Sequence, residues 1–206
     1  MFYTPYIPAW FIKLNTSLVW SIPTKEKELY LTFDDGPHET ATPFVLDQLK
    51  QYNAKGTFFC LGKNVQSYPN IYERILCEGH TVGNHTFNHL NGWKTKNKLY
   101  VKDITAAATY IDSKLFRPPY GKISPFVARM LRKKLDYKII MWHVLSCDFD
   151  ENITPQKCIE IVLLYSKPGS IIVFHDSTKA WPRMYYALPK ILEGFSNEGY
   201  IFKAIS

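Results

Sequence analysis

The sequence predicts an α/β fold in which about seven parallel strands are covered by helices. Short apolar runs alternate with helical patterns along the chain, which is typical of strand–helix–strand units. The 206 residues are 46% hydrophobic and 16% aromatic, which is enough for one domain with a substantial core. No internal repeat, low-complexity tract or interdomain linker divides the chain.

The expected strands are apolar runs that end at turn residues or polar residues. They lie at Glu28–Phe33, Gly56–Cys60, Thr81–Asn84, Lys114–Arg117, Lys138–Trp142, Ser170–Phe174 and Gly199–Ala204. The expected helices lie at Ala41–Tyr52, Tyr68–Glu78, Asn97–Leu115, Pro125–Leu135, Pro155–Tyr165 and Leu188–Glu198. Two of these helices begin with proline after Ser124 or Thr154, which fits an N-cap followed by proline. Seven strands approach the number that closes a barrel.

Residues 1–27 form an N-terminal arm rich in aromatic residues. The arm has no basic leader, uninterrupted apolar stretch or small-residue cleavage site, so no clear signal peptide is visible. It is also too short and too interrupted to span a bilayer. We expect the arm to pack on the domain of residues 28–206 in preference to inserting at a membrane interface. The compartment stays open between the cytoplasm and the cell envelope.

The chain is basic, with a net charge of +7 and a pI near 9.1. Such a charge favours anionic surroundings, and association with a cell wall or a membrane surface is compatible with it. Lysines and arginines gather at 94–102 and 129–134, which we interpret as two solvated helix faces. No nucleic-acid-binding motif accompanies the charge, so we predict no nucleic-acid partner. The four cysteines form no C-x-x-C pair, which disfavours a structural zinc site.

Two short motifs carry the chemistry. Asp34 and Asp35 end the first apolar run and are followed by Gly-Pro, which neither strand nor helix readily continues. His85 and His89 follow the third run. Each motif alone is typical of a turn or of surface histidines. Together, at the C-terminal ends of parallel strands, they favour a catalytic metal site, because one carboxylate and two imidazoles leave coordination positions open.

Three further segments complete a recognisable set of motifs. They are Phe116–Gly121, Trp142–Phe149 and Ile171–Asp176. In this order the five motifs resemble those of the NodB-like polysaccharide deacetylases, carbohydrate esterase family four. The resemblance runs from about Leu29 to the C-terminus, and it implies a single-domain distorted, incomplete (β/α) barrel.

The resemblance also implies a metal site and a base. Asp35, His85 and His89 would hold one divalent metal ion, most plausibly zinc, with cobalt and nickel as alternatives. Asp34 would act as general base on a water molecule activated at the metal. The Thr86 hydroxyl would tie down the loop between the two histidines. The two acids are adjacent, so we expect a local twist at the strand end, with Gly-Pro as a place for it.

The other motifs imply the remaining roles. His175 would be the general acid, oriented by Asp148, and Arg117 would pair with Asp34. The Tyr120 backbone N–H would complete the oxyanion site. The substrate-contacting residues would be Tyr120, Pro119, Phe149 and Val173. In the fourth motif Leu145 and Phe149 replace an acid and a tryptophan of the family pattern, so the sugar-facing wall differs.

These roles imply hydrolysis of N-acetyl groups on amino sugars of a glycan, such as peptidoglycan or a chitin-like oligosaccharide. A deacetylase or deformylase of a lipid-linked or nucleotide-linked sugar is an alternative within enzymes. A catalytically silent glycan-binding module is an alternative from another class. We expect a carbohydrate partner and a monomer.

Overall fold

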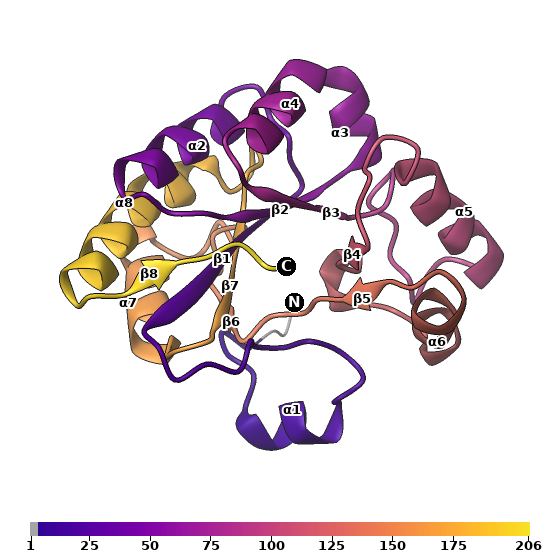
Figure 1. Cartoon of the computed structure of the whole chain (residues 1–206), viewed down its shortest axis with the longest axis horizontal. Coiled ribbons are helices and arrows are strands. Elements are labelled where there is room, and N and C mark those ends of the chain that lie inside the picture. Colours follow the sequence, from indigo (N-terminus) through magenta and orange to yellow (C-terminus); the bar gives the residue numbers. More distant parts are fainter. Residues whose placement is uncertain (1–3) are drawn as a thin grey trace.

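The computed structural model describes residues 4–206 as a curved sheet of parallel strands with helices on its outer side (Figure 1). The strands pair in the order β5-β4-β3-β2-β1-β7-β6, and β8 pairs with the start of β1. They are β1 (Glu28–Asp34), β2 (Thr57–Cys60), β3 (Thr81–Asn84), β4 (Leu115–Phe116), β5 (Lys138–Ile139), β6 (Val144–Leu145), β7 (Ile171–His175) and β8 (Ile201–Phe202). This arrangement confirms the distorted, incomplete (β/α) barrel. Strand β6 was not predicted, because only two residues pair there with β7.

The helices that alternate with the strands cover the outside of the sheet (Figure 1). They are α2 (Ala41–Gln51), α3 (Gly62–Ser67), α4 (Pro69–Cys77), α5 (Asn97–Ala107), α6 (Pro125–Lys134), α7 (Pro155–Tyr165) and α8 (Trp181–Asn197), with a 3₁₀ turn η1 at Pro119–Gly121. Helix α1 (Ala9–Leu14) belongs to the N-terminal arm. Helix α5 ends earlier than predicted, because residues 108–114 turn back so that Leu115 can lie beside β3. Helix α8 begins earlier than predicted and contains Pro189 in its interior.

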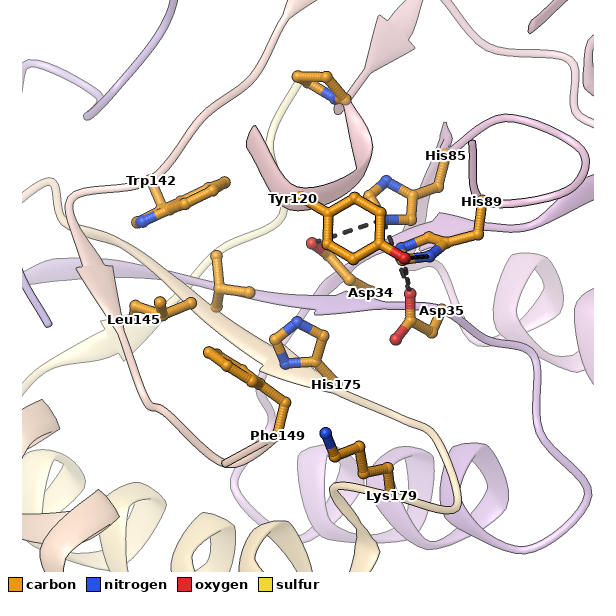
Figure 2. A pocket seen from close by; sticks show the side chains of 12 residues that line it. Asp34, Asp35, His85, His89, Tyr120, Trp142, Leu145, Phe149, His175 and Lys179 are labelled. Atoms are coloured by element: carbon orange, nitrogen blue, oxygen red, sulfur yellow. Dashed lines mark hydrogen bonds and ion pairs between the residues drawn. The ribbon is translucent and has the colours of Figure 1, made fainter. Parts of the chain in front are cut away.

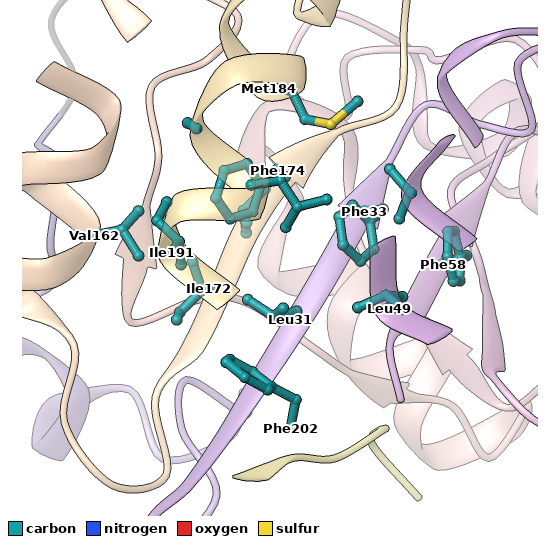
Figure 3. Packing of buried hydrophobic residues seen from close by; sticks show 14 of the residues in the cluster. Leu31, Phe33, Leu49, Phe58, Val162, Ile172, Phe174, Met184, Ile191 and Phe202 are labelled. Atoms are coloured by element: carbon teal, nitrogen blue, oxygen red, sulfur yellow. The ribbon is translucent and has the colours of Figure 1, made fainter. Parts of the chain in front are cut away.

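Strand β1 is buried along its whole length and positions the first acid. Successive side chains of a strand point to opposite faces. Leu31 and Phe33 therefore pack outward against the helices, and Phe33 stacks on Phe58 and Phe174 with ring centroids 5.0 and 6.1 Å apart (Figure 3). Thr32 and Asp34 point into the barrel, where both accept hydrogen bonds from a buried arginine. The alternation of side chains along β1 thus points Asp34 into the barrel.

The N-terminal arm lies across the gap between the edge strands β5 and β6. The Val19 N–H donates to the Ile139 carbonyl at 2.9 Å, and the Leu145 N–H donates to the Pro5 carbonyl at 2.8 Å. Residues 1–3 of the predicted arm lie outside the described residues. Within residues 4–206, the structure has no helix with the length and apolar character needed to cross a bilayer.

Candidate active site

The C-terminal ends of the parallel strands bring the predicted site residues around one cavity of about 370 Å³ (Figure 2). The acidic and imidazole groups occupy one side, apolar side chains occupy the other, and His175 lies between them. The cavity is lined by Asp34, Asp35, His85, His89, Pro118, Tyr120, Trp142, Leu145, Phe149, Val173, His175 and Lys179.

Asp35, His85 and His89 form a cluster that fits a metal ion. One ligand atom from each lies within 4.8 Å of the others. Asp35 Oδ1 is 3.1 Å from His89 Nε2 and 3.7 Å from His85 Nε2. This oxygen is buried and accepts no hydrogen bond from any residue between 4 and 206. A buried carboxylate oxygen without a donor is costly, and a cation among these three atoms would satisfy it.

The hydrogen bonds of the two imidazoles favour metal binding through Nε2. His85 Nδ1 lies 2.8 Å from the Arg117 carbonyl, which can only accept, so Nδ1 carries the proton and Nε2 has the free lone pair. Burial lowers the pKa of His85 to about 4, so the ring is neutral at pH 7. His89 Nδ1 lies 3.1 Å from the Tyr120 hydroxyl. The Tyr120 side chain therefore holds the second imidazole, a contact that was not predicted.

Left-handed backbone is concentrated at the site. Five non-glycine residues near the cavity have φ between 60° and 79°, namely Asp35, Thr86, His89, Tyr120 and Cys147. Such residues cost about 1–3 kcal/mol each and persist only where their surroundings hold them. The twist expected at Gly-Pro occurs instead at Asp35 itself, with φ 79°. The Thr86 hydroxyl accepts the His89 N–H at 2.9 Å, which confirms that it ties the loop between the two imidazoles.

Asp34 is paired with Arg117 inside the barrel. The guanidinium donates to Asp34 Oδ1 at 2.7 Å and to the Thr32 hydroxyl at 2.7 Å. It also donates to the Met141 carbonyl at 2.8 Å and lies 4.1 Å from the Phe59 ring centroid. Arg117 is fully buried, so its planar fork is held on all sides. The second oxygen of Asp34 stays free of the guanidinium.

His175 forms a second charged pair opposite the metal-ligand cluster. Its Nδ1 lies 2.7 Å from Asp148 Oδ1, and its backbone N–H donates to Asp148 Oδ2 at 2.8 Å. Burial lowers the pKa of His175, but Asp148 more than offsets burial and the pKa rises to about 9. Because Nδ1 is bonded to the carboxylate, Nε2 is the nitrogen available to the cavity.

The apolar wall differs in part from the prediction. Phe149 and Val173 line the cavity, and Phe149 packs edge-on against His175 with centroids 5.2 Å apart. Pro119 is not among the residues that line it, and the neighbouring Pro118 lines it instead. Trp142 and Lys179 also line the cavity, and neither was predicted as a site residue. For Trp142, its place at the start of the fourth motif was the available signal.

A buried carboxylate supports the turn that carries the first two acids. Asp176 is fully buried, and it accepts hydrogen bonds from the Gly36 N–H at 3.0 Å and from the Thr42 hydroxyl. A Cβ at Gly36 would lie 2.1 Å from Asp176 Oδ2, so only glycine fits there. Nearby, His38 Nδ1 accepts the backbone N–H groups of Thr40 and Ala41 at the start of α2, which is a structural role.

Comparisons with known proteins agree with this geometry. The sequence model of the polysaccharide deacetylase family matches residues 21–140. A peptidoglycan-N-acetylglucosamine deacetylase from Bacillus cereus is 35% identical over 196 residues, which cover 92% of this chain and 91% of the relative. A peptidoglycan-N-acetylmuramic acid deacetylase from Bacillus subtilis is 32% identical over 88% of this chain and 71% of its own length.

A solved structure gives the same result for the fold. The crystal structure of a peptidoglycan N-acetylglucosamine deacetylase in complex with 4-naphthalen-1-yl-N-oxidanyl-benzamide superposes with a TM-score of 0.87 and 32% identity, covering 97% of this chain and 95% of the other. The family match spans more than half of the chain, and the Bacillus cereus relative spans nearly all of it. The resemblance of the five motifs is therefore confirmed: the chain belongs to the polysaccharide deacetylase family and is a hydrolase.

Proposed function

We propose that the protein removes N-acetyl groups from the amino sugars of a glycan, releasing acetate and a free amine. Peptidoglycan is the favoured substrate class, because both relatives described above are named for it, and a chitin-like oligosaccharide is the second. The observation that carries the proposal is the division of polar groups around the cavity. A carboxylate with two imidazoles, an arginine-bound carboxylate and a carboxylate-bound imidazole all face one space of about 370 Å³.

The metal-ligand side prepares the attack. Asp35, His85 and His89 would hold one divalent ion, with zinc favoured by this donor set. When bound, such an ion polarises a carbonyl and lowers the pKa of a water molecule to about 7. Asp34 takes the proton of the attacking water, since one of its oxygens stays free of Arg117 and lies 4.0 Å from His85 Nε2. Arg117 keeps that carboxylate oriented.

His175 serves the leaving group, and Tyr120 serves the oxyanion. As the C–N bond breaks, the departing nitrogen must gain a proton, and His175 Nε2 donates it. Asp148 keeps the imidazole protonated and fixes its orientation through Nδ1. The Tyr120 backbone N–H, in a strained turn with φ 60°, stabilises the oxyanion of the tetrahedral intermediate. Leu145, Phe149 and Val173 form an apolar wall that suits the acetyl methyl group.

The alternative of a silent glycan-binding module would require loss of a ligand, the base or the acid. This chain retains Asp34, Asp35, both metal-binding histidines and His175 around one cavity. These residues favour turnover over binding alone.

The decisive experiment combines metal analysis with acetate release from peptidoglycan fragments and from N-acetylglucosamine oligomers. We expect about one bound divalent ion per chain and turnover that a chelator abolishes. Replacement Asp34→Asn should abolish turnover and keep the metal, because Asp34 is not one of the three ligands. Loss of metal in that variant would show that the two acids have exchanged roles. Absence of acetate release from every substrate by the metal-loaded wild type would overturn the proposal.

A further inference from the structure

An exposed tryptophan packs on the segment that follows Tyr120, one of the residues that line the cavity. Trp93 is 66% exposed and lies four residues after His89. Tyr120, which is 50% exposed, connects the two regions: its ring is 4.6 Å from that of His89, and its chain continues to Lys122. The Lys122 ammonium lies 4.0 Å from the centroid of the Trp93 ring. Trp93 is therefore connected to the cavity wall through the segment 120–123.

The Trp93 ring is held in place despite its exposure. Its indole N–H donates to the Ile123 carbonyl at 3.1 Å, and its backbone N–H donates to Asn91 Oδ1 at 2.9 Å. The preceding Gly92 lies so close to the next segment that a Cβ there would be 2.3 Å from the Lys122 carbonyl oxygen. A large side chain that is fixed and exposed binds a partner with little loss of conformational entropy, which is why tryptophan is enriched at binding hot spots.

The part of the chain that contains Trp93 is basic. Residues 79–147 contain twelve lysines and arginines, three aspartates and no glutamate. The net charge of this segment is therefore 12 − 3 = +9, which exceeds the +7 of the whole chain. Lys94, Lys96 and Lys98 are exposed and form no ion pair with any residue of the described range 4–206. They lie just before or at the start of α5, which begins at the same end of the barrel as the site. A ligand with negative charge would complement these three lysines.

We propose that Trp93 is a stacking platform for a second sugar of the glycan chain, with Lys122 and the neighbouring lysines recognising a carboxylate on that chain. One face of the indole meets Lys122, and the exposed area elsewhere on the ring suits the apolar face of a pyranose. The ligand class is a carboxylate-bearing amino-sugar oligosaccharide. This proposal rests on the proposed function, because the sugar on Trp93 belongs to the same chain as the one deacetylated.

The test compares substrates of different length. The ratio of kcat/KM for a tetrasaccharide to that for a disaccharide should fall about tenfold in Trp93→Ala, the loss expected for one stacking anchor. Trp10→Ala is the matched control, because Trp10 is 64% exposed on the arm and belongs to no part of the site. The control should keep the wild-type ratio. An unchanged ratio in Trp93→Ala would overturn the proposal that Trp93 stacks on a second sugar.

A second variant separates stacking from a purely structural role. Trp93→Phe keeps an aromatic face and loses the bond to the Ile123 carbonyl. Recovery of most of the length ratio, with metal content equal to wild type, supports stacking. A loss as large as that of Trp93→Ala, or release of metal through the His89 loop, would show that Trp93 only holds the loop and would overturn the proposal.

Recognition of a carboxylate by Lys122 is tested in a separate experiment. Tetrasaccharides with alternating carboxylate-bearing sugars are compared with neutral N-acetylglucosamine tetramers. Lys122→Gln should lower the preference for the charged substrate severalfold, and added salt should lower that preference in the wild type. Equal effects on both substrates would refute recognition of a carboxylate. Failure of the wild type to release acetate from any oligosaccharide would instead contradict the proposed function.

Discussion

Replacement of Asp148 by asparagine should test the acid side of the site most directly. The carboxylate accepts one hydrogen bond from His175 Nδ1 at 2.7 Å and one from the His175 backbone N–H at 2.8 Å. Asparagine has nearly the same shape, so the fold is kept and the negative charge is removed. Without that charge, burial lowers the pKa of His175, and only the charges of Asp35 and Asp34 still raise it.

The expected magnitude follows from the pKa of His175. The rise from the ordinary value of 6.5 to about 9 corresponds to about 3 kcal/mol of interaction with the protonated ring. At pH 7.5 nearly all of the wild-type ring carries its proton, whereas a group with pKa 6.5 is only about one-tenth protonated. We therefore expect kcat for an amide substrate at pH 7.5 to fall about tenfold or more in Asp148→Asn. In a plot of kcat against pH, the loss of activity on the alkaline side should move from near pH 9 to below 6.5.

The same pKa has a consequence for stability. Because the folded-state pKa is raised, His175 stabilises the fold fully below about pH 6.5, and this contribution is lost as the pH rises through about 9. The free energy of unfolding of Asp148→Asn should thus lie about 3 kcal/mol below wild type at pH 6, and the gap should narrow towards pH 9 or above.

The assay is a pH–rate profile of acetate release, together with urea unfolding at several pH values. Asp136→Asn is a matched control, since Asp136 is exposed in a turn at φ 56°, a conformation that asparagine adopts readily. An activated ester, whose leaving group needs no proton, should be much less affected than an amide. An alkaline limb that stays near pH 9 in Asp148→Asn, or equal losses for ester and amide, would refute the assignment of His175 as the acid.

Three further substitutions probe the metal-binding side. Arg117→Met should lower the free energy of unfolding by about 3–5 kcal/mol in urea titration, because Asp34 is left charged and buried; a loss under about 1 kcal/mol would contradict this. Tyr120→Phe should weaken metal binding about tenfold in a chelator competition, because His89 Nδ1 loses its hydrogen-bond partner. An unchanged metal affinity would show that this contact does not support metal binding. Gly36→Ala should reduce metal content while circular dichroism stays native, because the added Cβ would lie 2.1 Å from a buried carboxylate oxygen. Full metal loading of that variant would show that the turn tolerates displacement.

The sequence by itself determined the strand and helix alternation and the residues that meet at the site. Apolar runs and turn residues are local signals, and they located all of the longer strands, although β6 with its two paired residues was too short to predict. The parallel arrangement then implies that residues following different strands share one end of the barrel. The acid pair at 34 and 35 could therefore be grouped with His85 and His89 without any knowledge of distances, and the family resemblance then indicated Asp35 as the ligand.

Only the tertiary structure decided how the neighbouring groups are oriented. The twist that turns Asp35 towards the histidines lies at its own φ of 79°, supported by Asp176, which is 140 residues from its partner Gly36. The contact of Tyr120 with His89 likewise joins segments 31 residues apart in the chain. A local pattern predicts which residues arrive at a strand end, but side-chain direction there depends on long-range packing and backbone strain, which no short stretch of sequence contains.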